Sequence, residues 1–336
     1  MIYLFIFIII FVNVVIKKSL IFEDKIEFSN HKSFISKKKI PTTGGIYLLF
    51  FFIIFYKDFN FLSCVYIVLM FMIGFSSDRF KNFSPKLRLI IQIFLTLLFI
   101  INSGTYILDV RIDIINSILT KHFQVSIIFT IFCFIVLING TNFIDGVNLN
   151  TIGYYLTIYL IIYYLSYNNN LFIDLVFLKS LILFLTALYF LNLLNKMQLG
   201  DSGSYLVSFF TAFYIIQFVN FNSIVSPYFA ILLLWYPCFE NLFSILRKNY
   251  QKKEISSPDN LHLHHSIYFF LKIKKFKFLN NLTGLIINLF NAVSLIIGGY
   301  YFYSTKILIV IILINICFYV LIYNILIKKN LRKKFF

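Results

Sequence analysis

The chain has 336 residues, of which 60% are hydrophobic, and it includes 44 phenylalanines and 23 tyrosines. A soluble domain of this composition would expose large apolar patches and aggregate, so we expect an all-α protein that lies mostly in lipid. The net charge of +17 does not indicate nucleic acid, because basic loops that face an anionic membrane leaflet produce the same excess.

Apolar runs that approach the length needed to cross a hydrocarbon core of roughly 30 Å recur along the whole chain. We expect eleven transmembrane helices, near residues 1–16, 45–57, 61–76, 88–103, 124–139, 151–167, 171–190, 204–220, 227–245, 281–302 and 306–327. Between the fourth and fifth spans, ILDVRIDI (107–114) alternates apolar and polar residues, which predicts a short strand. No linker or repeat divides the sequence, so residues 1–336 are expected to form one domain.

The basic residues predict how the helices are oriented. With the N-terminus outside, the inner segments hold 25 of the 30 lysines and arginines, the outer segments hold four, and Lys179 lies within a span. This bias follows the positive-inside rule, so we expect a cytoplasmic C-terminus. Basic residues follow the first apolar run and none precedes it, which is the reverse of a cleavable signal peptide. All four cysteines fall inside expected spans, which predicts neither a disulfide framework nor a zinc site.

The second expected span opens with PTTGG (41–45). Proline costs nothing at a helix start, and paired glycines let a ligand or a backbone approach closely. Lys37, Lys38 and Lys39, which stand just before, could contact phosphate. The candidate substrate-binding residues here are Lys37, Lys38 and Thr42, and a capped helix with a basic membrane anchor is the alternative.

Aspartates stand at the ends of two expected spans. Asp78 follows the third span in GFSSDRF (74–80), and an ionised carboxylate at membrane depth is usually interfacial or functional because it costs roughly 2.5–3.5 kcal/mol. A surface ion pair with Arg79 is the alternative. Asp201 opens the eighth span in LGDSGSYL (199–206), where a helix N-terminus favours anions and metal-bound phosphates, and a simple N-cap is the alternative.

The loop NGTNFIDGVNLN (139–150) joins two spans without a basic residue. Asn139, Asn142 and Asp145 recur every three residues, so one helical turn would place them on one face. Their oxygens suit Mg²⁺, which takes one or two protein oxygens and fills its other positions with water and phosphate. The alternative is that the asparagines form interhelical hydrogen bonds.

Three of the five histidines fall in SPDNLHLHHSI (257–267). If Asp259 caps a helix, His262 and His265 share one face and His264 lies to the side. Zinc is not favoured, because no cysteine or matching ligand set lies nearby. Histidine titrates near neutral pH, so the cluster suits phosphate binding or proton transfer, with a solvated loop as the alternative.

These motifs all fall on the inner face. They lie in segments near residues 17–45, 77–88, 139–150, 191–204 and 246–280. In this order and on this side, PTTGG, GFSSDR, NGTNFIDG, LGDSGS and HLHH resemble the polyprenyl-phosphate N-acetylhexosamine-1-phosphate transferases (glycosyltransferase family 4) over nearly the whole chain. The histidine motif is more similar to the branch that initiates O-antigen (lipopolysaccharide) synthesis than to the peptidoglycan translocase.

The resemblance implies a bacterial inner-membrane enzyme that transfers a sugar 1-phosphate, of the N-acetylhexosamine 1-phosphate class, from a UDP-sugar to undecaprenyl phosphate. UMP is released and synthesis of a cell-surface polysaccharide begins. The implied cofactor is Mg²⁺, with Mn²⁺ as a substitute. The implied partners are the UDP-sugar, the lipid phosphate and the bilayer, without nucleic acid, and a homodimer is left open.

The resemblance also implies roles for the matched positions. Asp201 and Asn142 would hold the magnesium, and Asp145 with the asparagines around it, Asn139 included, would line the nucleotide-sugar site. Asp78 would lie where the polyprenyl phosphate arrives. The histidines at 262, 264 and 265 would bind the diphosphate or stabilise its charge. Cancelling charge between two anionic phosphates is what an in-line transfer needs.

The chain departs from the family at two places. Ser77 stands where the family usually has the first of two aspartates, and Leu149 and Asn150 stand where a DGxxGL pattern has Gly and Leu. A catalytically silent relative that binds lipid phosphate or scaffolds a polysaccharide complex is therefore the alternative function. A transporter is not favoured, because Glu240 is the one acidic residue well inside a span, and a hydrogen-bonded glutamate near the inner end explains it.

Overall fold

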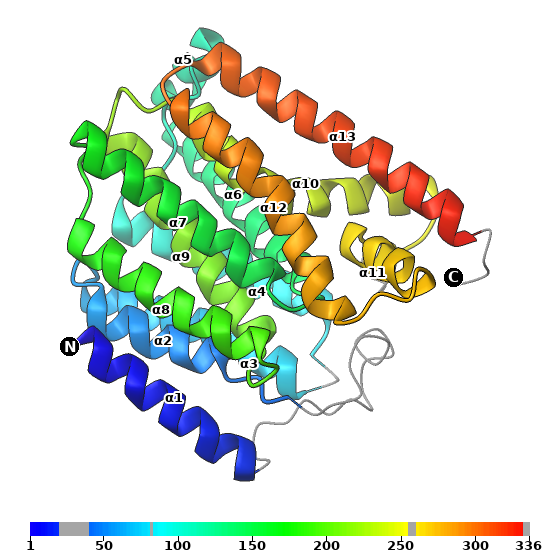
Figure 1. The fold of residues 1–336 in the computed structure, drawn as a ribbon. Helices are drawn as coiled ribbons and strands as arrows, with labels where there is room; N and C mark the ends of the chain where they lie inside the picture. Colours follow the sequence, from blue (N-terminus) through cyan, green and yellow to red (C-terminus); the bar gives the residue numbers. More distant parts are fainter. Residues whose placement is uncertain (20–39, 81–82, 255–259, 332–336) are drawn as a thin grey trace.

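The computed structural model describes residues 1–19, 40–80, 83–254 and 260–331, and this part of the chain forms thirteen helices (Figure 1). They are α1 (Ile2–Ser19), α2 (Gly44–Phe55), α3 (Phe61–Arg79), α4 (Pro85–Ser103), α5 (Asp113–Lys121), α6 (Phe123–Ile144), α7 (Asn150–Asn169), α8 (Leu175–Leu193), α9 (Gly200–Phe221), α10 (Pro227–Tyr250), α11 (Leu263–Ile273), α12 (Leu279–Tyr300) and α13 (Thr305–Leu331). The all-α prediction is confirmed for the described residues.

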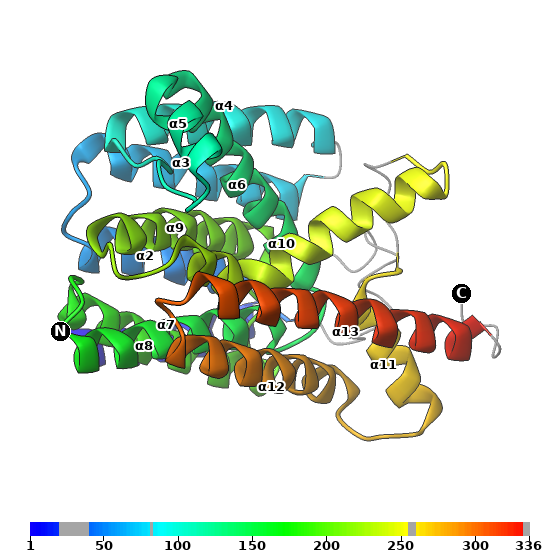
Figure 2. The same ribbon diagram turned by 90° about the horizontal axis from the view of Figure 1, so that it is seen from above.

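Each of the eleven expected spans corresponds to one helix, and α5 and α11 are the two helices that were not expected as spans. Eight of the described helices are long and apolar enough to cross a membrane. Three of the eleven helices that match expected spans are not in this group, because α1 and α2 have shorter apolar stretches and α7 is rich in tyrosine. The start of α1 and the end of α13 lie at opposite ends of the bundle in Figures 1 and 2.

Short polar side chains set where four of the helices begin. Asn60, Ser84, Asp174 and Ser226 each accept a hydrogen bond from a backbone N–H in the first turn of α3, α4, α8 and α10. Such caps satisfy N–H groups that have no partner within the helix. A proline follows the cap in α4 and in α10, where the missing N–H costs nothing.

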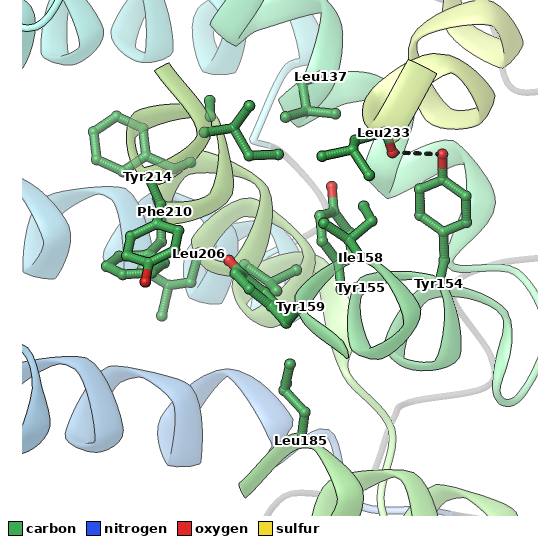
Figure 3. Close-up of a cluster of buried hydrophobic side chains, with 14 of the residues drawn as sticks. Leu137, Tyr154, Tyr155, Ile158, Tyr159, Leu185, Leu206, Phe210, Tyr214 and Leu233 are labelled. Carbon is green, nitrogen blue, oxygen red and sulfur yellow. Dashed lines mark hydrogen bonds between the residues drawn. The ribbon is translucent and has the colours of Figure 1, made fainter. Parts of the chain in front are cut away.

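The central helix of the bundle is α9. It is buried along most of its length because α2, α3 and α6 pack against it. Tyr159 of α7 also reaches it, and its hydroxyl shares a hydrogen bond of 2.7 Å with Thr211. Figure 3 shows Tyr159 beside Leu206 and Phe210 of α9 in this apolar cluster. The first turn of α9, which carries Asp201, is therefore held on a rigid element.

A proline inside α10 is accommodated by the neighbouring helix α7. Pro237 lacks the N–H that would bond to the carbonyl of Leu233 one turn earlier. The hydroxyl of Tyr154 donates to that carbonyl oxygen instead, at 2.8 Å (Figure 3). No buried carbonyl is left unpaired by the proline at this point, and α7 is joined to α10.

The strand expected at residues 107–114 is wrong. Asp113 begins α5, and the residues before it take no regular structure. Local side-chain bonds replace a strand partner there, since Asn116 accepts from the backbone N–H of Val110 at 2.8 Å and Asp109 accepts from that of Arg111 at 2.7 Å. Alternation of apolar and polar residues does not specify a strand when asparagine and aspartate can bond to the backbone nearby.

The motifs lie at the ends of α3 and α6 and at the starts of α2, α7 and α9, and α11 lies at that end of the bundle, opposite α5, in both views (Figures 1 and 2). Glycine allows the closest helix contact there. A Cβ on Gly74 of α3 would meet the backbone N of Ser202 at 2.6 Å and the backbone O of Asp201 at 2.7 Å. The absence of a side chain at Gly74 thus fixes the distance between α3 and the start of α9.

Gly74→Ala should therefore lower the free energy of unfolding by about 1–3 kcal/mol, because the contacted atoms belong to the backbone and cannot rotate away. Gly299→Ala is the matched control, since its Cβ would meet only side-chain methyl groups, of Ile161 at 3.3 Å and of Leu165 at 3.9 Å. The measurement is the thermal unfolding midpoint of each purified variant in detergent. Equal midpoints for the two variants would contradict the close approach of α3 and α9.

Candidate active site

Asp78 binds the N-terminus of α9. Its Oδ1 accepts from the backbone N–H of Asp201 at 2.9 Å, and its Oδ2 accepts from the backbone N–H and the hydroxyl of Ser202 at 3.1 and 3.0 Å. Negative charge is favoured at this end of a helix. Gly200, with a φ of +73°, leaves room for the carboxylate, since a Cβ there would meet Oδ2 at 2.8 Å. Asp78 therefore joins the GFSSDRF motif to the LGDSGSYL motif. A surface ion pair between Asp78 and Arg79, the alternative interpretation, does not explain these bonds.

Asp201 is the second residue of α9, and the structure does not support the N-cap interpretation, because no side chain caps this helix from its N-cap position. Its Oδ2 accepts from the hydroxyl of Ser77 at 2.5 Å and from Nη1 of Arg88 at 3.2 Å. Arg88 also donates to the Ser77 hydroxyl oxygen and to the hydroxyl of Tyr205. Ser77 therefore lies between the arginine and the carboxylate.

Sequence reasoning missed Arg88 as a site residue and counted it only among the basic residues of the inner segments. Arg88 lies in the first turns of α4, after the Ser84 cap, and its side chain is 20% exposed against 17% for Asp201. The signal was a basic residue at the start of an expected span on the inner side. What the sequence could not indicate is that the arginine pairs with a residue 113 positions away.

The residues around Asp201 suit a magnesium ion. Both bonds to the Asp201 carboxylate go to Oδ2, so Oδ1 keeps its lone pairs. Asn142 presents its Oδ1 at 3.5 Å from the hydroxyl of Ser204, which also donates to the backbone oxygen of Asp201. The described residues contain no group of three or more metal-binding side chains, but Mg²⁺ needs only one or two protein oxygens when phosphates and water complete its shell.

Asn139 lies deeper along α6 than Asn142. Its amide nitrogen donates to Oε1 of Gln92 in α4 at 3.2 Å and to the backbone oxygen of Ile135 at 3.0 Å. This is an interhelical amide contact of the kind that the alternative interpretation anticipated. The expected helical turn that carries Asn139 and Asn142 is present, because α6 continues to Ile144 and Asp145 is its C-cap.

The loop after Asp145 contacts the histidine motif. A Cβ on Gly146 would meet Cδ2 of the His264 ring at 2.8 Å, so the ring packs directly on the backbone of this loop. His264 is only 1% exposed, and neither ring nitrogen has a hydrogen-bond partner. Burial, and then the nearby His265 and His262, lower the pKa of His264 well below its usual value. His264 is therefore neutral at physiological pH.

His262 pairs with the acidic residue that lies well inside a span. Its Nδ1 is 3.0 Å from Oε1 of Glu240, which is fully buried, and Tyr319 donates to the other oxygen of Glu240 at 2.7 Å. The interpretation of Glu240 as a hydrogen-bonded glutamate is thus confirmed. Phe143, between Asn142 and the Asp145 loop, has its ring 5.0 Å from that of His262. His265 is 8% exposed, with its ring 4.1 Å from that of His264.

Asparagines, which sequence reasoning did not assign to this role, hold the Asp145 loop in place. Asn192 accepts from the backbone N–H of Leu149 at 2.6 Å, and Asn148 donates to the side-chain oxygens of Asn195 and Asn281 at 2.7 and 2.9 Å. Leu149 has a φ of +68°, a conformation that favours glycine. This backbone geometry explains why the family pattern has glycine at the position where this chain has leucine.

The PTTGG segment lies against the loop that precedes α9. Gln198 donates from its backbone N–H to the oxygen of Pro41 at 2.9 Å and accepts from Gly44 at 3.1 Å. Thr42 is buried in this contact region, at 4% exposure. Lys37, Lys38 and Lys39 fall outside the described residues, so their proposed contact with phosphate stays a prediction.

Comparisons with known proteins agree with this arrangement. Residues 60–219 match the family described as glycosyl transferase family 4. A Thermotoga maritima protein described as an undecaprenyl-phosphate alpha-N-acetylglucosaminyl 1-phosphate transferase is 26% identical over 281 residues, which cover 83% of this chain and 84% of that protein. A Bacillus subtilis protein described as a probable undecaprenyl-phosphate N-acetylglucosaminyl 1-phosphate transferase is 35% identical over 79 residues, which cover 22% of this chain and 21% of that protein.

The matched region includes Asp78, Arg88, Asn142, Asp145 and Asp201, and the longer of the two alignments extends over most of the helices. The apolar helices and these bacterial relatives together make the protein a multi-pass protein of the bacterial inner membrane. The match of residues 60–219 to glycosyl transferase family 4 and the two relatives support the polyprenyl-phosphate N-acetylhexosamine-1-phosphate transferase superfamily as the family that this chain resembles.

Proposed function

We propose that this protein transfers an N-acetylhexosamine 1-phosphate from a UDP-sugar to undecaprenyl phosphate, releases UMP and so initiates synthesis of a cell-surface polysaccharide. The observation that carries the proposal is the group of Ser77, Asp78, Arg88 and Asp201, brought together by α3, α4 and α9 at the end of the bundle where α11 and its histidines lie. The names of the two relatives support undecaprenyl phosphate as the acceptor and an N-acetylglucosaminyl 1-phosphate as the kind of group that is transferred.

The charges at this end suit the reaction. Donor diphosphate and acceptor phosphate are both anionic, so they approach each other only where positive charge and hydrogen-bond donors offset their repulsion. Arg88 supplies positive charge beside Asp201. Asp201 and Asn142 would hold a Mg²⁺ ion, for which Mn²⁺ could substitute, and the ion would neutralise the phosphate oxygens that it binds.

The other matched residues position the reactants. Asp78 orients the first turn of α9, and with it Asp201, through three hydrogen bonds. Asp145 lies on the loop that packs against His264, so the nucleotide-sugar site and the histidine motif would share one wall. We assign His262 and His265 to the diphosphate, and His264, which is neutral and buried, to the packing that holds them.

The alternative is a catalytically silent relative that binds lipid phosphate or scaffolds an assembly complex, and Ser77 was its main support. The geometry weakens that support. The Ser77 hydroxyl donates to Asp201 and accepts from Arg88, so serine completes the hydrogen bonds of the group. An active transferase with one carboxylate fewer is therefore the function that this site supports best.

The first prediction about function is that the purified protein in detergent releases UMP when it is given Mg²⁺, undecaprenyl phosphate and one member of a panel of UDP-N-acetyl sugars. Release should require the lipid phosphate and stop when EDTA removes the metal. The panel also identifies the sugar and tests whether the O-antigen branch assignment holds. No UMP with any donor, from protein with a cooperative unfolding transition, would favour the silent relative.

The second prediction separates the two aspartates. Asp201→Asn should lower turnover by at least about 100-fold, because it removes charge where the metal and phosphates would meet, and should lower the unfolding midpoint less than Asp78→Asn does, because its part-exposed pair with Arg88 contributes about 0–1 kcal/mol. Asp78→Asn should lower both, since it removes an acceptor of charge-assisted hydrogen bonds worth about 1.5–3 kcal/mol each. Both quantities are measured on the same preparations, and an Asp78→Asn variant with wild-type stability would contradict the capping role.

The third prediction concerns Ser77. Ser77→Ala should lower kcat/KM by about 10-fold, which corresponds to about 1.4 kcal/mol and is the expected effect of losing one hydrogen bond to a charged group. Ser77→Asp should remain within about 10-fold of the wild type, because Arg88 would lie between the two carboxylates and offset their repulsion. A gain of more than about 100-fold in Ser77→Asp would show that serine impairs the natural protein.

A further inference from the structure

The role of a buried acidic residue, Glu240, is not explained by the reaction outlined above. Its side chain has no solvent exposure, although it lies in the inner half of α10. Burial of a carboxylate is costly unless it is paired and hydrogen-bonded. The groups that pair with Glu240 therefore indicate what it does.

Glu240 is bonded to three groups. Oε1 is 3.0 Å from Nδ1 of His262 and accepts from the backbone N–H of Leu263 at 3.4 Å, and Oε2 accepts from the hydroxyl of Tyr319 at 2.7 Å. Oε1 of Glu240, in the ionised form of the carboxylate, only accepts hydrogen bonds, and this pairing then requires a proton on Nδ1 of His262. The second ring nitrogen, Nε2, points away from Glu240.

The backbone on both sides of His262 is also held. Nη1 of Arg247, two turns after Glu240 in α10, donates to the backbone oxygen of Leu261 at 2.6 Å and to the hydroxyl of Tyr323 at 3.1 Å. The His262 ring lies 5.7 Å from that of His264, nearly parallel to it. Glu240 and Arg247 of α10, each bonded to a tyrosine of α13, thus hold the backbone from Leu261 to Leu263, which leaves the His262 ring little freedom to turn.

We propose that Glu240 is a positioning residue that fixes the ring orientation and the Nδ1-protonated state of His262, so that His262 presents Nε2 to the diphosphate of the nucleotide-sugar donor. This inference rests on the proposed function. In the protonated ring Nε2–H donates to a phosphate oxygen, and the carboxylate of Glu240 balances the charge. Carboxylates behind histidines act in this way in other sites, where the proton on one ring nitrogen is set by the bond that the other makes.

If Glu240 had a purely structural role, loss of either of its hydrogen-bond partners would have a similar effect on activity. Substitution of Tyr319, which bonds to the same carboxylate, therefore serves as the control. Glu240→Gln keeps the size of the side chain but removes the charge, and an amide nitrogen in the place of Oε1 would donate to Nδ1, reverse the proton placement and leave Leu263 without its acceptor. Tyr319→Phe removes one hydrogen bond from the same carboxylate and keeps the ring that packs on Phe239 and Phe243. Only the first variant changes the charge of the group that faces Nδ1 of His262.

Kinetics on the full-length protein test the proposal. Glu240→Gln should lower kcat/KM for the UDP-sugar by about 10–100-fold, the usual cost of changing a residue behind a functional histidine, and Tyr319→Phe should stay within about threefold. In the background of His262→Ala, Glu240→Gln should cause no further loss, because two residues that act through one contact are not additive. Equal effects of Glu240→Gln and Tyr319→Phe, or full additivity with His262→Ala, would overturn the proposal.

A spectroscopic measurement does not depend on turnover. In protein labelled with ¹⁵N-histidine, and assigned by comparison with His262→Ala, Nδ1 of His262 should show the chemical shift of a protonated nitrogen. An unprotonated Nδ1 would overturn the proposal even if Glu240→Gln failed to fold. If the wild type released no UMP with any donor, the proposed function would fail, whereas a protonated Nδ1 would still establish the pairing of Glu240 with His262.

Discussion

The bond between the Asp78 carboxylate and the start of α9 is the interaction on which the site depends. It satisfies two backbone N–H groups that the helix itself cannot satisfy, and it places a negative charge at the positive end of the helix dipole. Because α9 is the central helix, whatever fixes its first turn also fixes the direction of Asp201. Gly74 permits this bond by allowing α3 and α9 to approach to backbone contact.

The number of charged residues around Asp201 differs from the family pattern. Where the family usually has two adjacent aspartates, this chain has one aspartate and one serine, and a single arginine, Arg88, donates to both Ser77 and Asp201. Fewer negative charges beside a metal site weaken its attraction for a cation but also reduce its repulsion of incoming phosphates. The geometry therefore accommodates serine without leaving the arginine or the carboxylate unpaired.

The sequence was sufficient to predict the helical class, the order of the spans and the end of the bundle at which the motifs meet. Apolar length and charge bias are properties of local segments, so one chain reveals them. The contacts of Arg88 and Asn192 were not predictable, because each pairs with a group more than 40 positions away. A helix in the histidine segment was expected only on the condition that Asp259 caps it; α11 begins at Leu263 with His262 as its N-cap, and a helix this short carries no long apolar run that would mark its start.

Leu149, which stands where the family pattern has glycine, is a second feature whose structural consequence could not be predicted from the sequence. The absence of glycine was visible in the sequence. Its structural effect depends on the positive φ of residue 149, which the pattern of side chains does not predict. Leucine in the left-handed region is disfavoured by roughly 1–2 kcal/mol. Here the residue is 1% exposed, and its N–H and its carbonyl oxygen both bond to asparagine side chains, Asn192 and Asn288. Burial and these two bonds offset the strain.

The asparagine contacts of Asn148, Asn192, Asn195 and Asn281 have a further consequence, because they contain no formal charge. Dissolved ions screen attraction between charged groups that face water, and they have little effect on hydrogen bonds between uncharged amides. The Arg88–Asp201 pair is part-exposed and responds to ionic strength. A change in cytosolic salt thus alters the electric field in which phosphates would bind, while the amide frame that shapes the adjacent loop keeps its dimensions.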